Sequence, residues 1–161
     1  MLFIRKINSI MSNRKIVFTN GVFDLIHVGH IYLFEEAKKL GYKLVVGLNS
    51  DKSATKIKRK PVNNQKERKR VLKAIKYIDE VRIFSEVNPL SLIRKVRPDI
   101  LIKGGDYIRS TVIGHEFVES YGGKVVVIPT LKGNSTTKTI KKIKSRSFKK
   151  GLPKNKGGYL S

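Results

Sequence analysis

The sequence predicts an α/β fold in which helices cover both faces of a five-stranded parallel sheet. Three observations support this prediction. Five short runs rich in Val, Ile and Leu have the length and composition of buried strands. The longer segments between them place apolar residues at helical spacing, and Gly, Asn and Pro mark several boundaries. Because alternating strands and helices build right-handed βαβ units, we expect parallel strands and a Rossmann-like architecture.

The elements can be assigned in order along the chain. The first strand is KIVFT at residues 15–19, and the first helix covers 31–40, with Gly41 at a position typical of helix C-termini. Asn88 and Pro89 have the residue types of an N-cap and a first helical position, so another helix begins there. The same criteria place further strands at 43–48, 81–84, 99–102 and 124–128, and further helices at 65–77, 111–121 and 135–143.

The helix at 65–77 has one apolar face, formed by Val71, Leu72, Ala74, Ile75 and Ile78. A chain of 161 residues has the length of one domain, which we place at 14–144 after an N-terminal extension at 1–13. Residues 145–161 combine Gly, Pro and many Lys, so we expect a disordered basic tail. The apolar run in the first ten residues is too short for a secretory signal, and no run is long enough to span a membrane. We therefore expect a cytoplasmic protein without a membrane partner.

The composition restricts the classes of site. The chain has no cysteine, which excludes disulfides, thiolate metal sites and cysteine nucleophiles. Its net charge of +23 is concentrated in runs such as 52–76 and 138–156. These runs suit a site for triphosphates, and they also suit a nucleic-acid-binding module, which is the non-enzyme alternative. Few aromatic residues and no nucleic-acid-binding motif argue against that module, although incidental polyanion binding is expected.

The loop after the first strand reads TNGVFDLIHVGH over residues 19–30, and a helix follows directly. A phosphate at that helix N-terminus would meet free backbone N–H groups and the positive end of the helix dipole. His27 and His30 can face the same anion, and imidazoles can stabilise charge on a transferred phosphoryl group. Metal ligation or a structural pair is the alternative for two histidines. Their position at a strand-to-helix corner beside Gly29 favours phosphate.

These residues resemble the HxGH nucleotidyltransferases of the cytidylyltransferase-like superfamily. The similarity extends over residues 14–144. Its further motifs are Asn49-Ser50-Asp51, Pro61-Val62-Asn63, Glu67-Arg68, Lys103-Gly104-Gly105-Asp106-Tyr107 and Gly133-Asn134-Ser135-Thr136-Thr137. Within the superfamily the chain is most similar to heptose 1-phosphate adenylyltransferases. Glycerol-3-phosphate cytidylyltransferases share the HxGH and STT elements.

The resemblance implies that a phosphorylated acceptor attacks the α-phosphorus of a nucleoside triphosphate and that pyrophosphate leaves. The favoured reaction transfers AMP from ATP to D-glycero-D-manno-heptose 1-phosphate, and the alternative transfers CMP from CTP to glycerol 3-phosphate. A Mg²⁺ ion is implied as the counter-ion of the triphosphate, held mainly by phosphates and water because the sequence offers no cage of carboxylates. A homodimer is also implied.

The resemblance assigns roles to three sets of residues. The catalytic set is His27, His30, Lys56 and Lys58. The nucleotide-binding set is Thr19, Asn20, Gly21, Val22, Phe23, Gly29, Arg68, Lys103, Gly104, Gly105, Asp106, Ser135, Thr136 and Thr137. The substrate-binding set is Asp24, Asn49 and Asp51, and no residue is assigned to a metal.

Several of these residues also have a plainer interpretation. Ser135 and Thr136 are typical helix caps. The basic loop 52–60 can be a solvated surface, and because it is shorter than in the family, which of its lysines contacts phosphate stays open. Arg68 can form a structural ion pair, and residues 104–106 can form a tight turn without a ligand.

Overall fold

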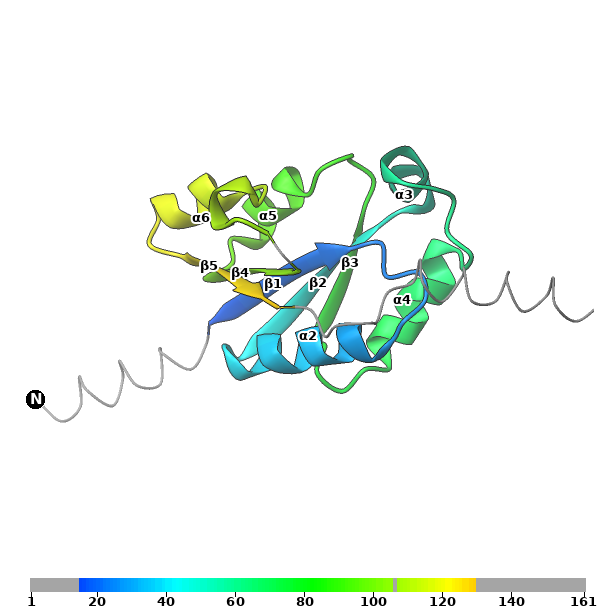
Figure 1. Cartoon of the computed structure of the whole chain (residues 1–161), viewed down its shortest axis with the longest axis horizontal. Helices are drawn as coiled ribbons and strands as arrows, with labels where there is room; N and C mark the ends of the chain where they lie inside the picture. The colour runs from blue at the N-terminus through cyan, green and yellow to red at the C-terminus, as the bar shows by residue number, and fades with distance from the viewer. Residues whose placement is uncertain (1–14, 106, 130–161) are drawn as a thin grey trace, which may run out of the picture.

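A computed structural model describes residues 15–105 and 107–129 (Figure 1). Its centre is one sheet in which every strand is parallel to its neighbours. The strands are β1 (Ile16–Gly21), β2 (Lys43–Asn49), β3 (Glu80–Phe84), β4 (Ile100–Gly104) and β5 (Lys124–Ile128). Their order is β3-β2-β1-β4-β5, so the predicted α/β, Rossmann-like fold with five parallel strands is confirmed.

Helices cover both faces of the sheet, as predicted, and each face has its own apolar core (Figure 1). The helices are α2 (Val28–Lys39), α3 (Asp51–Ile57), α4 (Gln65–Lys73), α5 (Leu90–Val96) and α6 (His115–Ser120), with a 3₁₀ turn at Arg109–Thr111. Helices α2 and α4 pack on one face, and α5 and α6 pack on the other. Neighbouring residues of one strand serve opposite faces: Val17 belongs to the α2–α4 core, and Phe18 belongs to the α5–α6 core.

The sheet opens between β1 and β4. Strand β1 pairs with β2 over its full length, from Ile16 to Gly21. Its ladder with β4 has only two residue pairs, Val17 with Ile100 and Phe18 with Leu101. Strand order also reverses here, and ligands of open α/β sheets bind in the crevice at such a point.

Two differences from the sequence prediction concern helices on the β2–β3 side. The expected basic loop after β2 begins with a seven-residue helix, α3, whose N-cap Ser50 accepts a hydrogen bond from the Ser53 N–H. Helix α4 ends at Lys73, earlier than predicted, and it buries Arg68 and Leu72. Val71, which the apolar pattern placed in the core, is 48% exposed.

Glycines explain two further differences. The predicted helix at 111–121 is divided, because Gly114 has a φ of +92° that interrupts the helix before α6 begins at His115. Gly41 follows the C-cap residue Leu40 of α2 without a positive φ. Glycine is needed at position 41 for a steric reason, since a Cβ there would lie 2.5 Å from a methyl group of Val17.

Helix α5 begins one residue later than predicted, because Pro89 is its N-cap and Leu90 is its first residue. Asn88 still contributes a hydrogen bond, since its Oδ1 accepts one from the Leu90 N–H. None of the helices within residues 15–105 and 107–129 is long and apolar enough to cross a membrane. The N-terminal extension at 1–13, the predicted helix at 135–143 and the basic tail at 145–161 lie outside the described residues.

Candidate active site

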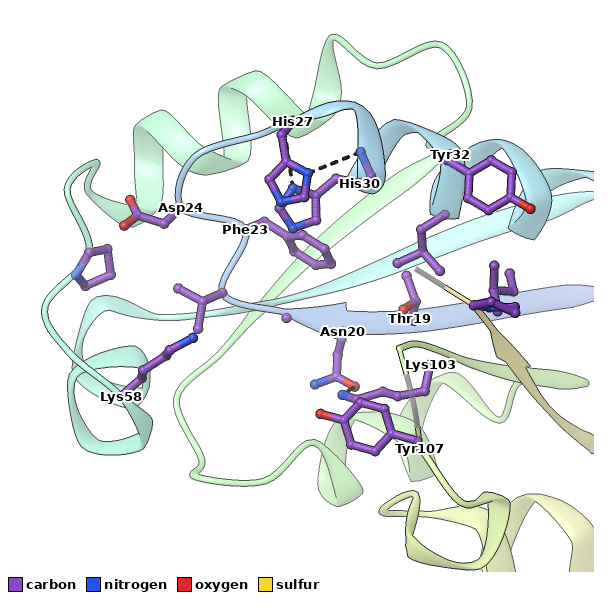
Figure 2. Close-up of a pocket in the computed structure, with 18 of the residues that line it drawn as sticks. Thr19, Asn20, Phe23, Asp24, His27, His30, Tyr32, Lys58, Lys103 and Tyr107 are labelled. Carbon is purple, nitrogen blue, oxygen red and sulfur yellow. Dashed lines mark hydrogen bonds between the residues drawn. The ribbon is translucent and has the colours of Figure 1, made fainter. Parts of the chain in front are cut away.

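A cavity of about 430 Å³ lies at the carboxyl ends of β1 and β4, beside the N-terminus of α2 (Figure 2). The structure brings twelve of the predicted site residues to its wall. These are Thr19, Asn20, Gly21, Val22, Phe23, Asp24, His27, Gly29, His30, Lys58, Lys103 and Gly104. The crevice expected at the point where strand order reverses is therefore present, and the HxGH loop forms one side of it.

His27 is the N-cap of α2 and His30 lies on its first turn. Their rings stack on each other, with centroids 3.8 Å apart (Figure 2). The Nδ1 of His27 accepts a hydrogen bond from the Gly29 N–H at 3.2 Å. The Nδ1 of His30 accepts one from the His27 N–H at 3.4 Å. The two side chains thus form a reciprocal capping box in which imidazoles replace the usual hydroxyl and carboxylate.

These hydrogen bonds correct one sequence expectation. Two backbone N–H groups at the start of α2, those of His27 and Gly29, are not free for an anion because the imidazoles occupy them. Since each Nδ1 is an acceptor, the proton of each neutral ring sits on Nε2. The side-chain hydrogen-bond donors offered by this motif are therefore the two Nε2–H groups.

Burial keeps this pair neutral. Desolvation, with a smaller contribution from His27, lowers the pKa of His30 to about 4. Desolvation also lowers the pKa of His27 below its ordinary value. Both rings therefore act at neutral pH as uncharged donors.

Phe23 forms the apolar floor under the histidines. Its backbone φ is +45°, an uncommon conformation for a bulky residue, and it turns the ring back over β1. A Cβ added to Gly21 would lie 3.0 Å from the Phe23 ring, so a larger residue there would require the ring to shift. The other side of the ring packs against Phe34 of α2. The turn of the chain at Phe23 therefore places its ring against His30, and the position of the imidazole depends on that turn.

Asp24 lies on the cavity wall, but other groups of the chain already bind its carboxylate. The oxygens accept hydrogen bonds from the backbone N–H groups of Val62 and Asn63, at 2.9 to 3.1 Å. The guanidinium of Arg59 lies 2.9 Å from the same carboxylate. These contacts tie the loop after β1 to the segment between α3 and α4.

Arg68 does not line the cavity, and its surroundings match the structural alternative. The side chain is 1% exposed. Its guanidinium donates to the backbone carbonyls of Asn63, Val22 and Asn49 and to the carboxylate of Asp51. Arg68 therefore holds together the ends of β1 and β2 and the start of α4.

Asn49, Asp51 and Lys56 also lie outside the cavity wall. The Asn49 amide donates to Ser53 within the buried start of α3. Lys56 is exposed on the last turn of α3, whereas Lys58, just after that helix, reaches the cavity. Gly105 is described but does not line the cavity, and Asp106, Ser135, Thr136 and Thr137 lie outside the described residues.

Two polar side chains at the base of the cavity lack ordinary partners. Thr19 is 1% exposed, and its hydroxyl has no hydrogen-bond partner among the described residues. Lys103 donates to the Asn20 Oδ1 at 3.3 Å, and burial lowers its pKa. A buried hydroxyl is rarely left in this state, which indicates that a group other than the described residues, such as a ligand or water, completes the hydrogen bonding of Thr19.

Comparison with known proteins decides the family. Residues 18–149 match the family described as Cytidylyltransferase-like. The chain belongs to the cytidylyltransferase-like family. The prediction of a nucleotidyltransferase, made from the HxGH loop and its companion motifs, is thereby confirmed at the level of the family.

Relatives within the cytidylyltransferase-like family include two bifunctional proteins named HldE. The one from Koribacter versatilis (strain Ellin345) is 51% identical over 133 residues, which cover 81% of this chain and 27% of the relative. The one from Syntrophotalea carbinolica is 49% identical over 135 residues, which cover 83% and 28%. The chain thus spans little more than a quarter of the length of these relatives.

Solved structures agree with the family. The lipopolysaccharide core biosynthesis protein from Thermoplasma volcanium GSS1 is 27% identical, with a TM-score of 0.63 over 74% of this chain and 98% of that chain. Pantothenate synthetase from Thermus thermophilus superposes with a TM-score of 0.51 at 16% identity, over 86% of this chain and 68% of that one. The second likeness shows the fold alone.

Seven residues of the cavity wall were not singled out from the sequence. They are Tyr32, Leu33, Arg59, Pro61, Tyr107, Ile128 and Pro129. Pro61 and Tyr107 belong to motifs that the resemblance to the cytidylyltransferase-like family had marked, so those motifs could have suggested them. Leu33 and Ile128 follow the ordinary apolar pattern of a helix and a strand, which gives no sign of a ligand.

Proposed function

We propose that this chain transfers the adenylyl group of ATP to a sugar 1-phosphate, with D-glycero-D-manno-heptose 1-phosphate as the favoured acceptor, and releases pyrophosphate. The observation that carries the proposal is the stacked His27–His30 pair at the cavity, whose Nε2–H donors are not engaged by any described residue. The family supports the reaction class. High identity to HldE proteins and likeness to a lipopolysaccharide core biosynthesis protein support the choice of acceptor.

The reaction needs positioning and charge stabilisation rather than a covalent intermediate. A phosphate oxygen of the acceptor forms a bond to the α-phosphorus of ATP. The bond from that phosphorus to the oxygen bridging the β-phosphorus breaks, and its electron pair leaves with pyrophosphate. The neutral imidazoles of His27 and His30 donate hydrogen bonds to the α-phosphate oxygens as negative charge grows there.

Other cavity residues supply shape and charge in this proposal. The backbone from Gly21 to Phe23 lines the nucleotide pocket, and Lys58 draws phosphates in from the open side. Gly104, which has no side chain, allows the nucleotide to approach the end of β4 closely. We assign Arg68, Asp51 and Asn49 to holding this framework, in view of their internal hydrogen bonds. The roles expected of Asp106 and of 135–137 stay predictions.

Mg²⁺ enters the proposal as part of the MgATP substrate. The described cavity residues do not fit a metal site built by the protein, because the carboxylate of Asp24 is held by Val62, Asn63 and Arg59. Within residues 15–105 and 107–129, no group of three His, Asp or Glu side chains could hold a metal ion. Phosphate oxygens and water are the natural ligands of such an ion.

The test is pyrophosphate release with Mg²⁺, in which ATP, CTP, GTP and UTP are each combined with heptose 1-phosphate and with glycerol 3-phosphate. The matched blank is the double variant His27→Asn/His30→Gln. Asn at the N-cap and Gln three residues later keep a capping box but remove both imidazoles. Release with ATP and heptose 1-phosphate, lost in the blank, is the expected result.

The other outcomes are equally informative. Release with CTP and glycerol 3-phosphate would keep the histidine mechanism and replace both substrates. Equal release by the wild-type chain and the blank would remove the histidines from the reaction. No release in any pairing, from folded protein, would contradict the proposed function.

We further propose that the chain forms a homodimer, as the family resemblance implies. Sedimentation equilibrium at micromolar concentration is expected to give twice the mass of one chain. A mass equal to one chain, 18.3 kDa, would contradict this proposal.

A further inference from the structure

Lys103 approaches the cavity from the opposite face of the sheet to the histidines. On β4, Ile102 packs in the core under α2 and Leu101 packs under α5 and α6, so strand alternation puts Lys103 on the α5–α6 side. In Figure 2, the end of β1 separates His27 and His30 from Asn20, Lys103 and Tyr107. The cavity therefore has two polar walls, one on each face of the sheet.

The lysine wall holds a cation that has no counter-charge among the described residues. The Lys103 ammonium donates to the neutral Asn20 Oδ1 at 3.3 Å and lies 5.7 Å from the centre of the Tyr107 ring. It forms no ion pair with a carboxylate anywhere in residues 15–105 and 107–129. Burial alone accounts for its lowered pKa.

Arg68, a fully buried cation of the same chain, shows the contrast with the half-buried Lys103. Arg68 has the Asp51 carboxylate at 2.7 Å and three backbone carbonyls as acceptors. Buried charges in proteins are normally paired in this way, because an unpaired charge in a low-dielectric site is unfavourable. Lys103 faces a cavity instead, and an anion entering that cavity would supply the missing charge.

We propose that Lys103, oriented by Asn20, binds the phosphate group of the acceptor, while the histidine pair across the end of β1 holds the α-phosphate of ATP. This inference rests on the proposed function. Adenylyl transfer brings two phosphates together, and in-line attack requires the nucleophile and the leaving group on opposite sides of the α-phosphorus. Two donor walls on opposite faces of the sheet give each of the two reacting phosphates its own set of donors in one cavity, and an ammonium serves as a point charge for phosphate.

The test separates acceptor binding from ATP binding. Lys103→Met removes the charge at similar length, and Lys103→Arg keeps the charge. The control is Lys124→Met, an exposed lysine at the far end of β5, the strand next to β4. We expect Lys103→Met to raise the KM for heptose 1-phosphate about tenfold or more, the usual effect of losing a hydrogen bond to a charged group.

The remaining kinetic expectations define what would overturn the inference. In Lys103→Met the KM for ATP should stay within about twofold, and Lys103→Arg should recover most of the acceptor affinity. The Lys124→Met variant should match the wild type. A KM for ATP that rises as much as that for the acceptor, or an acceptor KM that does not change, would overturn the proposal.

Asp106 is close to Lys103 in sequence and lies outside the described residues, so a double variant is included. If Lys103 acted only by neutralising that carboxylate, Lys103→Met/Asp106→Asn would regain the wild-type acceptor KM. Regained affinity would overturn the proposal. A double variant as weak as Lys103→Met supports it.

Binding of inorganic phosphate, followed by NMR without ATP or turnover, distinguishes failure of this inference from failure of the proposed function. Phosphate should shift the amide signals of Asn20 and Gly104 in the wild type and in Lys103→Arg, but not in Lys103→Met. If the wild type is inactive in every pairing but binds phosphate in this way, the anion site stands and the proposed function fails. If the wild type is active but the shifts are unchanged in Lys103→Met, the inference alone fails.

Discussion

The ring of Phe23 stands edge-on to the imidazole of His30, with the two centroids 5.4 Å apart and the planes at 75°. This contact removes water from one side of the imidazole, and desolvation is the main reason for the low pKa of His30. Phe23, which precedes α2, thereby influences the protonation state of His30 on that helix.

Replacement of Phe23 should therefore change a titration as well as stability. We expect Phe23→Leu to raise the pKa of His30 from about 4 toward its ordinary value, because the smaller side chain admits water. NMR titration of the histidine ring protons measures this. The control is Phe84→Leu, a buried ring in the core on the other face. Both variants should lose about 1 to 3 kcal/mol of unfolding free energy. An unchanged pKa of His30 in Phe23→Leu would contradict this view of the contact.

The His30 pKa also predicts how stability depends on pH. The pKa in the folded state, about 4, lies below the ordinary value of 6.5, so the unfolded chain binds the proton more readily. The contribution of neutral His30 is complete above pH 6.5 and is lost as the pH falls toward 4. Its size is at most roughly 3 kcal/mol.

The measurement is urea unfolding of the wild type and of His30→Gln at several pH values from neutral down to about the folded-state pKa of His30. Gln keeps the capping geometry and does not titrate. The wild type should lose more unfolding free energy over this range than the variant. Parallel curves for the two proteins would show that His30 is not buried as neutral imidazole.

Arg68 should be a major contributor to stability. Arg68→Met removes the donor of three backbone carbonyls, one of them in a buried hydrogen bond, and leaves the Asp51 carboxylate without its partner, so we expect a loss of about 3 kcal/mol or more in unfolding free energy. Arg70→Met, at an exposed position on the same helix, serves as the control and should change stability by less than about 0.5 kcal/mol. Chemical denaturation measures both. Equal, small effects would show that the Arg68 hydrogen bonds make no net contribution.

In contrast to Arg68, Thr19 has a buried hydroxyl whose removal should not lower the unfolding free energy. Its hydroxyl has no partner in the described residues, so Thr19→Val should leave the unfolding free energy unchanged or raise it by up to about 1 kcal/mol. If the hydroxyl contacts the nucleotide, as the sequence predicts, the KM for ATP rises severalfold in the same variant. Thr19→Ser keeps the hydroxyl and should retain the ATP affinity. A large loss of stability in Thr19→Val would contradict this assignment.

The strands and the histidine loop could be predicted from sequence because their signals are local. A buried parallel strand is a continuous apolar run, and the residues that follow β1 are contiguous in the chain. Helix α3 was missed because it is short and buries only Ser53 and Ala54, so it has no apolar stripe. Its caps and the turn after it depend on contacts with distant segments.

The roles of charged residues could not be predicted in the same way. A carboxylate such as Asp24 looks the same in sequence whether it binds a substrate or two backbone amides from 62–63. Arg68 and Lys103 are both cations within family motifs, the first buried and the second half-buried. Only the folded arrangement distinguishes the one that has acceptors on every side from the one that faces a cavity.

The short ladder between β1 and β4 has a consequence for aggregation. Past Phe18 and Leu101, each strand continues for three residues without a partner across the gap, so the crevice creates two additional strand edges inside the sheet. An exposed strand edge is a template on which another chain can add a strand. These two edges are only three residues long and face each other, so they are short templates for a strand from another molecule. The ends of β1 and β4 can thus leave main-chain groups unpaired at the cavity with less risk of aggregation than a long strand edge on the outside of the sheet would carry.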